Sequence, residues 1–175
     1  MSADYNIYVF PYEKGGDSRA LLREAAARET GLSPGAFAVE TGPWGKPFFP
    51  NRPALHFSVT HSGGWWLCAF GSAPVGLDLQ DHRPAPREKL ARRYFHPDEV
   101  SFLEARGFEG FFDIWAAKES YVKYTGQGLY TPLDSFSVVQ GDGFAVCGAQ
   151  LRPLDFCPAP SLCLCTEDPG RIALS

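Results

Sequence analysis

The chain of 175 residues is 45% hydrophobic and 21% charged, and its formal net charge at pH 7 is −4. This composition is typical of a globular protein with one compact domain or two small fused halves, and the acidic balance argues against a nucleic-acid partner. No segment has the pattern of a signal peptide or the roughly 20 apolar residues of a membrane span, so we expect a cytoplasmic protein without a membrane partner.

The first half of the sequence predicts strands, one helix and a hairpin. Residues 7–10 are β-branched or aromatic, which is typical of a strand. Residues 19–29 are rich in alanine and leucine and predict a helix that Asp17 or Ser18 can cap and that ends at Gly31. Further strands are predicted at residues 37–40, 56–60 and 65–70, the last two joined by a glycine turn into a hairpin.

The second half predicts a strand at residues 75–79, helices at 87–95 and 97–105, a third helix and a strand at 136–138. The third helix is apolar nearly all round, as buried helices are, yet it carries Lys118, Glu119 and Lys123. Residues four apart share a helix face, so Glu119 and Lys123 form one stripe. A buried carboxylate needs a partner, which favours a phosphate or metal site here over a surface ion pair.

The two halves are similar in outline. In each, a helix ends in Thr-Gly, and a proline and an apolar segment follow. Such short matches also arise by chance, so a duplication and a coincidence both remain open. A duplication would divide the chain into residues 1–74 and 75–175 with a site between them. When the two helices are aligned at their Thr-Gly ends, Arg23, Glu24 and Arg28 correspond to Lys118, Glu119 and Lys123. In the same way, the hairpin at 58–70 would correspond to a second hairpin at 162–174.

The carboxylates suit a magnesium ion. Asp78 ends an apolar strand, where a side chain can project into a cleft, and with Glu119 it could hold a hard cation. Alone, Asp78 would more often be a strand-end residue. Donors for phosphate oxygens are Lys118, Lys123, His61, Thr60, Ser62 and the backbone of Gly63 and Gly64.

Five motifs follow one another in a fixed order between residues 45 and 129. They are Gly45-Lys46-Pro47, Phe57-Ser58-Val59-Thr60-His61-Ser62, Val75-Gly76-Leu77-Asp78, Phe95-x-x-x-Glu99 and Trp115-x-x-Lys118-Glu119-Ser120-x-x-Lys123-x-x-Gly126-x-Gly128-Leu129. In this order they resemble the signatures of the 4′-phosphopantetheinyl transferases. The chain is most similar to the larger, surfactin-synthetase-activating class of that family, which is pseudo-dimeric.

The resemblance implies an α+β fold of two related halves, each a small antiparallel sheet packed against a long helix. Coenzyme A would bind between the halves of this pseudo-dimer, and the protein would be a monomer. Residues 1–74 would form the side that binds the adenine and phosphates of coenzyme A. Residues 75–175 would form the magnesium and catalytic side.

The resemblance also implies a reaction: transfer of 4′-phosphopantetheine from coenzyme A to a serine of an acyl or peptidyl carrier protein, with release of adenosine 3′,5′-bisphosphate. Asp78 and Glu119 would be the Mg²⁺ ligands, and Glu119 could take the serine proton. Lys123 would contact the pyrophosphate as a second catalytic residue. The coenzyme A-binding residues would be Lys46 and Pro47 near the adenine and Thr60, His61, Lys118 and Lys123 at the phosphates.

Two departures from the family pattern bear on this prediction. Gln80 stands where many relatives carry a third acidic ligand, so we expect weaker metal binding rather than none, with Asp81 as a substitute one residue off register. Only about eight residues separate Phe10 from Arg19, where larger relatives have a basic segment for the 3′-phosphate of coenzyme A.

Two other functions remain open from the sequence. One is a non-catalytic, degenerate transferase that only binds coenzyme A or a carrier protein, and the other is a magnesium phosphohydrolase with a poised water. Nucleotide-binding glycine loops and a Ser-His-Asp order are missing. The helix with Arg87, Lys89, Arg92 and Arg93 is basic, so it could bind an acidic carrier protein, but it could equally be a solvated surface. Phe95, Phe102 and Leu103 could belong either to the core or to the interface with the carrier.

Overall fold

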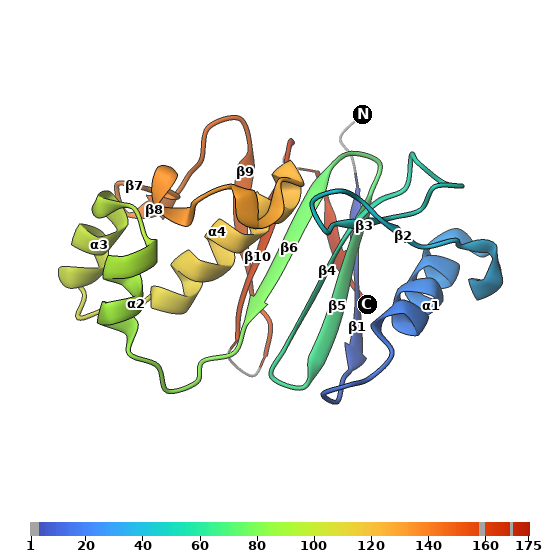
Figure 1. Ribbon diagram of the computed structural model, residues 1–175, viewed down its shortest axis with the longest axis horizontal. Coiled ribbons are helices and arrows are strands. Elements are labelled where there is room, and N and C mark those ends of the chain that lie inside the picture. Colours follow the sequence, from blue (N-terminus) through green and yellow to red (C-terminus); the bar gives the residue numbers. More distant parts are fainter. Residues whose placement is uncertain (1–3, 158–159, 169) are drawn as a thin grey trace.

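The computed structural model describes residues 4–157, 160–168 and 170–175, apart from the side chain of Leu129. Two sheets lie at the centre of the described structure, with α-helices on both flanks (Figure 1). The α+β class predicted from the sequence is confirmed. No helix in the described ranges is long and apolar enough to cross a membrane.

The first sheet has the strand order β11-β1-β5-β4. Its strands are β1 (Tyr5–Pro11), β4 (His56–Ser62), β5 (Trp65–Gly71) and β11 (Ile172–Leu174). The hairpin of β4 and β5 turns at Gly63 and Gly64, whose φ angles of 58° and 83° are left-handed and suit glycine. Strand β11 runs parallel to β1, so residues from the predicted second half complete the sheet of the first half.

The second sheet has the order β6-β10-β9 and is antiparallel throughout. Its strands are β6 (Val75–Gln80), β9 (Gln150–Leu154) and β10 (Ser161–Thr166). Buried side chains of both sheets meet in a central core that includes Tyr5, Ile7, Leu67, Leu77 and Leu164. This core holds the two sheets against each other.

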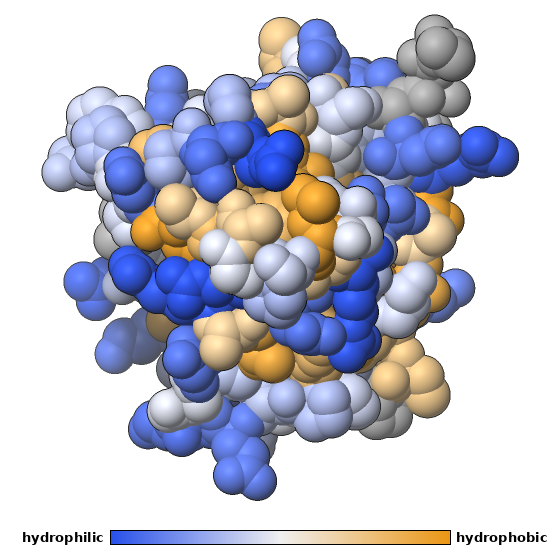
Figure 2. Space-filling model, turned by 90° about the vertical axis from the view of Figure 1, so that its right-hand side faces the viewer, coloured by the Kyte–Doolittle hydropathy of each residue, from blue (hydrophilic) through white to orange (hydrophobic). Residues whose placement is uncertain are grey.

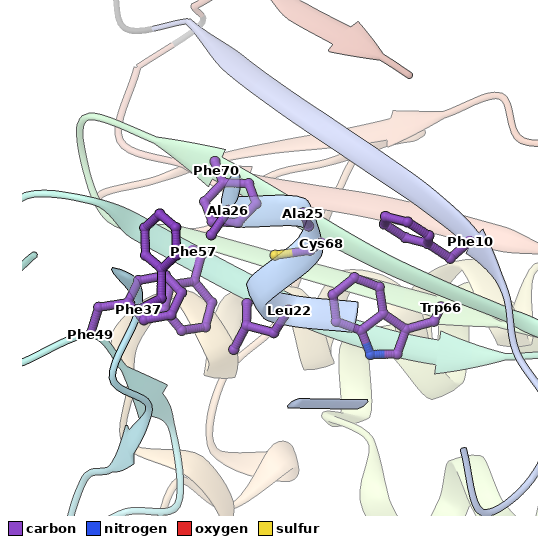
Figure 3. Close-up of a cluster of buried hydrophobic side chains, with 10 residues drawn as sticks. All are labelled: Phe10, Leu22, Ala25, Ala26, Phe37, Phe49, Phe57, Trp66, Cys68 and Phe70. Carbon is purple, nitrogen blue, oxygen red and sulfur yellow. The ribbon is translucent and has the colours of Figure 1, made fainter. Parts of the chain in front are cut away.

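Helix α1 (Ser18–Thr30) covers the outer face of the first sheet. The Asp17 side chain accepts hydrogen bonds from two free N–H groups of the first turn, and Gly31 ends the helix with a φ of 74°, both as predicted. In Figure 3, Leu22, Ala25 and Ala26 of α1 lie between two aromatic groups: Phe10 and Trp66 on one side, and Phe37, Phe49 and Phe57 on the other. The face of the molecule on this side mixes hydrophilic and apolar residues (Figure 2).

Helix α4 (Phe111–Thr125) covers the outer face of the second sheet and packs on β6 and β10. Helices α2 (Arg87–Tyr94) and α3 (Pro97–Glu104) lie in the connection between β6 and α4 and add Phe95 and Leu103 to its core. Phe95 and Leu103 are buried, so they are core residues, whereas Phe102 is half-buried under the guanidinium of Arg106.

Three predicted elements are wrong. Residues 37–39 and 136–138 are irregular segments and not strands. The first follows the 3₁₀ turn η1 (Pro34–Ala36), which begins with a proline. The second follows the 3₁₀ turn η3 (Leu133–Ser135), which comes directly after Pro132. Short hairpins follow these segments, namely β2 (Glu40–Thr41) with β3 (Pro47–Phe48) and β7 (Val139–Gln140) with β8 (Gly143–Phe144). The predicted second hairpin at 162–174 is split, because β10 pairs with β6 and β9 while β11 pairs with β1. A third 3₁₀ turn, η2 (Gly128–Tyr130), follows α4.

Candidate functional site

Gly76 allows α4 to lie directly on β6. A Cβ atom at this position would be 1.9 Å from the carbonyl oxygen of Ser120 and 2.5 Å from the backbone nitrogen of Tyr124. Those atoms belong to the helix backbone and have no rotamer by which to move away. Glycine in the Gly76-x-Asp78 motif therefore brings the helix that carries Glu119 and Lys123 against the strand that carries Asp78.

The Asp78 carboxylate lies at the centre of a hydrogen-bonded group. Its Oδ1 atom accepts from Lys123 Nζ at 2.6 Å and from Thr60 Oγ1 at 3.3 Å, and its Oδ2 atom accepts from Gln80 Nε2 at 2.7 Å. Lys123 Nζ also donates to the Leu77 carbonyl at 3.1 Å. Asp78 is 4% exposed, so this is a buried carboxylate held by one cation and two neutral donors.

Glu119 lies next to this group on the half-buried face of α4. Burial raises the pKa of its carboxyl group, the negative charge of Asp78 raises it further, and the positive charge of Lys123 partly offsets both. The two carboxylates are thus close enough to repel one another. A divalent cation would relieve this repulsion, and the all-oxygen donor set is the type that Mg²⁺ prefers.

The donor set fits magnesium better than a metal that needs a full protein cage. In the described ranges no three His, Cys, Asp or Glu side chains cluster closely enough to hold a metal by themselves. Magnesium is commonly bound by one or two carboxylates together with waters and substrate phosphates. Asp78 and Glu119 meet that pattern. Gln80, which departs from the family pattern of a third acidic ligand, is neutral and donates a hydrogen bond to Asp78.

Two cavities open beside the carboxylates, and Lys123 lines both. The first, of about 330 Å³, is lined by Glu119 and by the predicted adenine-side residues Lys46 and Pro47. The second, of about 440 Å³, is lined by Asp78 and Gln80 and is bordered by Thr60, His61, Ser62, Asp81 and Arg83. The two cavities share Val59 and Lys123, and between them they are lined by the predicted residues Lys46, Pro47, Thr60, His61, Asp78, Glu119 and Lys123.

Lys46 is more constrained than the sequence indicated. Its ammonium group donates to the carbonyl of Lys123 at 2.6 Å and to that of Val75 at 3.2 Å. Burial, together with the positive charge of Lys123, lowers the pKa of Lys46 to about 8. The head group therefore ties the loop of residues 41–53 to the end of α4 and the start of β6, and Lys46 and Pro47 also line the first cavity.

Lys118 is not brought to this site, contrary to the sequence prediction. Its side chain is fully buried, and Nζ donates to Glu99 Oε1 at 2.7 Å and to the Phe136 carbonyl at 2.6 Å. Glu99, which is also fully buried, accepts in addition from the backbone N–H groups of Val138 and His96. Lys118 therefore binds α3 to α4 and cannot reach a phosphate in this structure. Glu99 stood in the motif Phe95-x-x-x-Glu99, but nothing in the sequence indicated that it would pair with Lys118.

Trp44, which lines the first cavity, and Tyr130, whose ring contacts that of Trp44, were not singled out from the sequence. Trp44 and Tyr130 are 51% and 73% exposed, and their ring centroids are 4.6 Å apart. Gly128 makes this contact between loops feasible, because a Cβ atom there would be 2.7 Å from the Trp44 carbonyl oxygen. The signal that could have identified Trp44 is its place in a proline- and glycine-rich loop, directly before the motif Gly45-Lys46-Pro47.

Comparisons with known proteins agree with the motifs. The family model of the 4′-phosphopantetheinyl transferase superfamily matches residues 74–159. A 4′-phosphopantetheinyl transferase of Bacillus subtilis is 41% identical over 128 residues, which is 70% of this chain and 57% of that protein. The 4′-phosphopantetheinyl transferase Sfp of Bacillus subtilis strain 168 is 39% identical over 122 residues, or 67% of this chain and 54% of that protein.

A third relative, the 4′-phosphopantetheinyl transferase HetI of Nostoc, is 35% identical over 120 residues, or 63% of this chain and 51% of that protein. The chain thus spans about half the length of the curated relatives that it matches. The matched residues include the Gly76-x-Asp78 strand and the helix with Glu119 and Lys123. The chain therefore belongs to the 4′-phosphopantetheinyl transferase superfamily, and within it to the Sfp-like class.

Proposed function

We propose that this chain transfers the 4′-phosphopantetheine group of coenzyme A to a serine of an acyl or peptidyl carrier protein, with magnesium as the metal. The observation that carries the proposal is the convergence of Asp78, Glu119 and Lys123 between two cavities. Lys123 borders both of them. No hydrolase-type nucleophile is needed, because the attacking hydroxyl belongs to the carrier protein.

Coenzyme A would occupy the region between the sheets. Its adenine end would lie toward Lys46 and Pro47 in the first cavity, and its pyrophosphate would lie at Lys123. Two of the three N–H groups of the Lys123 ammonium donate to Leu77 and Asp78 among the described residues, which leaves one to meet a phosphate oxygen. His61 is exposed at the edge of the second cavity and would contribute a further donor.

The serine oxygen would form a bond to the phosphorus that carries the pantetheine arm, as Glu119 accepts the serine proton. The bond from that phosphorus to the bridging oxygen breaks, and adenosine 3′,5′-bisphosphate leaves with that oxygen. Lys123 would stabilise the negative charge that grows on the leaving phosphate. A magnesium ion held by Asp78 and Glu119 would neutralise pyrophosphate charge when bound.

The surface of α2 is the proposed place for the carrier protein. A hollow of about 690 Å³ there is lined by Arg87, Lys89, Arg92 and Arg93, together with Glu88. Arg92 is paired with Glu88 and Glu104, so the cations that an acidic helix of a carrier protein would complement are chiefly Arg87, Lys89 and Arg93. We propose a monomer, because the residues proposed for the site all belong to one chain, and we propose a cytoplasmic location because of the proposed substrates.

The test is the intact mass of an apo carrier protein after incubation with this chain, coenzyme A and magnesium. We expect a gain of one phosphopantetheine, and a loss of rate by about 100-fold or more in Glu119→Gln. Glu24→Gln is the matched control, because Glu24 occupies the corresponding place on α1 and lies on the surface. It should modify the carrier at the rate of the original chain.

Other outcomes would identify the rival functions. No mass gain with several carriers, together with coenzyme A binding in calorimetry, would point to a non-catalytic binding module. Release of adenosine bisphosphate without any carrier would indicate a phosphohydrolase. Transfer at the normal rate by Glu119→Gln would refute the role assigned to this carboxylate.

A further inference from the structure

Three hydroxyl groups of β4 meet three backbone N–H groups at the edge of β6. The Leu77 nitrogen donates to Ser58 Oγ at 2.9 Å and the Leu79 nitrogen to Thr60 Oγ1 at 3.1 Å. The nitrogen of Asp81, just beyond β6, donates to Ser62 Oγ at 3.0 Å. The three hydroxyl residues are spaced two apart along β4, and the three N–H groups are spaced two apart along β6 and the residue after it. Side chains two apart lie on one face of a strand, so one face of β4 is opposite one edge of β6.

The contact is not an ordinary sheet ladder. Strands β4 and β6 are each at the edge of their own sheet in the described structure, and no backbone pairing between them is part of either sheet. Side-chain hydroxyls instead accept from the backbone groups that an edge strand leaves free. A side chain placed between two backbones keeps the strands farther apart than the roughly 4.8 Å of a regular ladder. Both cavities lie along this strand: Ser58 and Val59 line the first, and Val59, Thr60 and Ser62 line the second.

Ser58, Thr60 and Ser62 occupy positions where the first sheet otherwise presents apolar side chains. On β5 the corresponding central-core positions are Leu67 and Ala69. Ser58 and Thr60 are only 3% and 5% exposed, so burying their hydroxyls would be costly without hydrogen bonds. The N–H groups of β6 supply those bonds, and in turn the hydroxyls supply the acceptors that buried N–H groups need.

Thr60 has a second role that the other two hydroxyls lack. Its single hydroxyl hydrogen points to Asp78 Oδ1 at 3.3 Å while its oxygen accepts from Leu79. The hydroxyl therefore links the backbone of β6 to the carboxylate on the same strand. It has no second hydrogen to donate, so it cannot hold Asp78 and donate to a phosphate at the same time.

We propose that Ser58, Thr60 and Ser62 form a hydroxyl ladder that joins the two sheets at a fixed spacing, and that its middle rung, Thr60, positions the Asp78 carboxylate. Thr60 acts through Asp78 and is thus a positioning residue. The joining role stands on the hydrogen bonds themselves, whereas the effect on metal binding rests on the function proposed above.

Amide hydrogen exchange of the full chain tests the ladder without reference to catalysis. Ser58→Ala should speed exchange at Leu77, Thr60→Val at Leu79 and Ser62→Ala at Asp81, each by about tenfold or more, because each loses the one acceptor of that N–H. Thr60→Ser keeps the hydroxyl and should retain protection at Leu79. Thr30→Val is the matched control, since its hydroxyl donates to Ala26 at the far end of α1.

Binding of Mn²⁺, followed by electron paramagnetic resonance with and without coenzyme A, tests the positioning role. Thr60→Val should weaken Mn²⁺ binding by about tenfold or more, as loss of a contact that orients a ligand commonly does. Thr60→Ser should restore most of the affinity and Thr30→Val should retain all of it. Ser58→Ala and Ser62→Ala should have smaller effects than Thr60→Val, because their hydroxyls do not touch Asp78.

Each half of the proposal has its own contrary result. Unchanged exchange at Leu77, Leu79 and Asp81 in the three variants would refute the ladder. Equal Mn²⁺ affinities of the original chain and Thr60→Val, with Leu79 exchange increased, would leave the joining role and refute the positioning role. Absence of Mn²⁺ binding in the original chain would refute the positioning role together with the proposed function, while exchange would still decide the joining role.

Discussion

Helices α1 and α4 occupy corresponding places on the two sheets, but only α4 carries the candidate site. Arg23 and Lys118, paired by the sequence, each donate to the carbonyl of a phenylalanine in the segment after their helix, Phe37 and Phe136. Both helices end at a left-handed glycine, with φ angles of 74° and 73°. These parallels are what a duplication would produce, and the duplication itself stays a prediction.

The differences come from what surrounds each helix. Residues 12–17 connect β1 to α1 and contain no helix, whereas α2 and α3 lie between β6 and α4. Because α3 supplies Glu99, Lys118 is fully buried, while Arg23 remains half-buried. The pair Glu24–Arg28 stays on the surface, and the matching Glu119 and Lys123 turn toward Asp78. Similar helices thus acquire different chemistry from their connections.

Among the variants considered, Lys118→Met should reduce stability most, and Arg23→Met at the corresponding position of α1 should reduce it much less. Lys118→Met leaves the Glu99 carboxylate buried without its cation and should cost about 3–5 kcal/mol of unfolding free energy in urea titrations. Arg23→Met removes a hydrogen bond to a carbonyl and should cost about 1 kcal/mol. The double variant Lys118→Met/Glu99→Leu should recover part of the loss. Equal costs at the two positions would contradict the comparison.

Gly76→Ala tests the close approach that is specific to α4. The added methyl group meets helix backbone, so we expect a loss of about 1–3 kcal/mol in unfolding free energy and reduced transfer to the carrier. Gly35→Ala is the matched control, because nothing lies within 4 Å of a Cβ atom there and its φ is not left-handed. An unchanged stability of Gly76→Ala would show that α4 can move away from β6 at little cost.

Lys46, which ties the loop of the first half to α4, should give the chain a distinct pH dependence. Its folded pKa of about 8 is below its ordinary value of 10.5. Between these values the unfolded chain binds the proton and the folded chain does not, so Lys46 makes stability rise with pH. Relative to Lys46→Met, the original chain should gain up to about 2 kcal/mol of unfolding free energy from pH 7.5 to 9.5. A difference between the two proteins that stays constant with pH would contradict this.

The smallest effect is expected for the surface pair on α1. Arg28 and Glu24 are 54% and 45% exposed, and such pairs spaced four residues apart contribute little. Glu24→Gln should change the unfolding free energy by no more than about 0.5 kcal/mol. A loss well above that, measured by urea titration, would mean that α1 depends on this pair and would make the two halves more alike than the structure indicates.

The sequence was most informative where local chemistry decides the structure. Asp17 and Gly31 define α1, and Gly63-Gly64 defines the hairpin, because caps and glycine turns act over a few residues. The motifs also identified Asp78, Glu119 and Lys123, which do converge. Their catalytic and metal-binding roles remain predictions.

Local patterns failed where distant residues decide. Phe37 and Phe136 looked like strand residues, but each carbonyl accepts from a cation on the preceding helix, and each backbone follows a 3₁₀ turn. Lys118 looked like a phosphate ligand because nothing in its own helix indicates that Glu99 lies opposite. Lys46 likewise meets two carbonyls, of Val75 and Lys123, that only the folded chain brings together.

The pairing of β11 with β1 bears on the order in which the protein takes shape during synthesis. Tyr5 lies opposite Ile172, so one edge of β1 has no neighbour until the ribosome has made almost all of the residues between them. Contacts so distant in sequence form slowly, because a long loop must close first. We expect the sheet of the first half to remain incomplete, with an exposed edge, until the second half has been translated and has delivered β11.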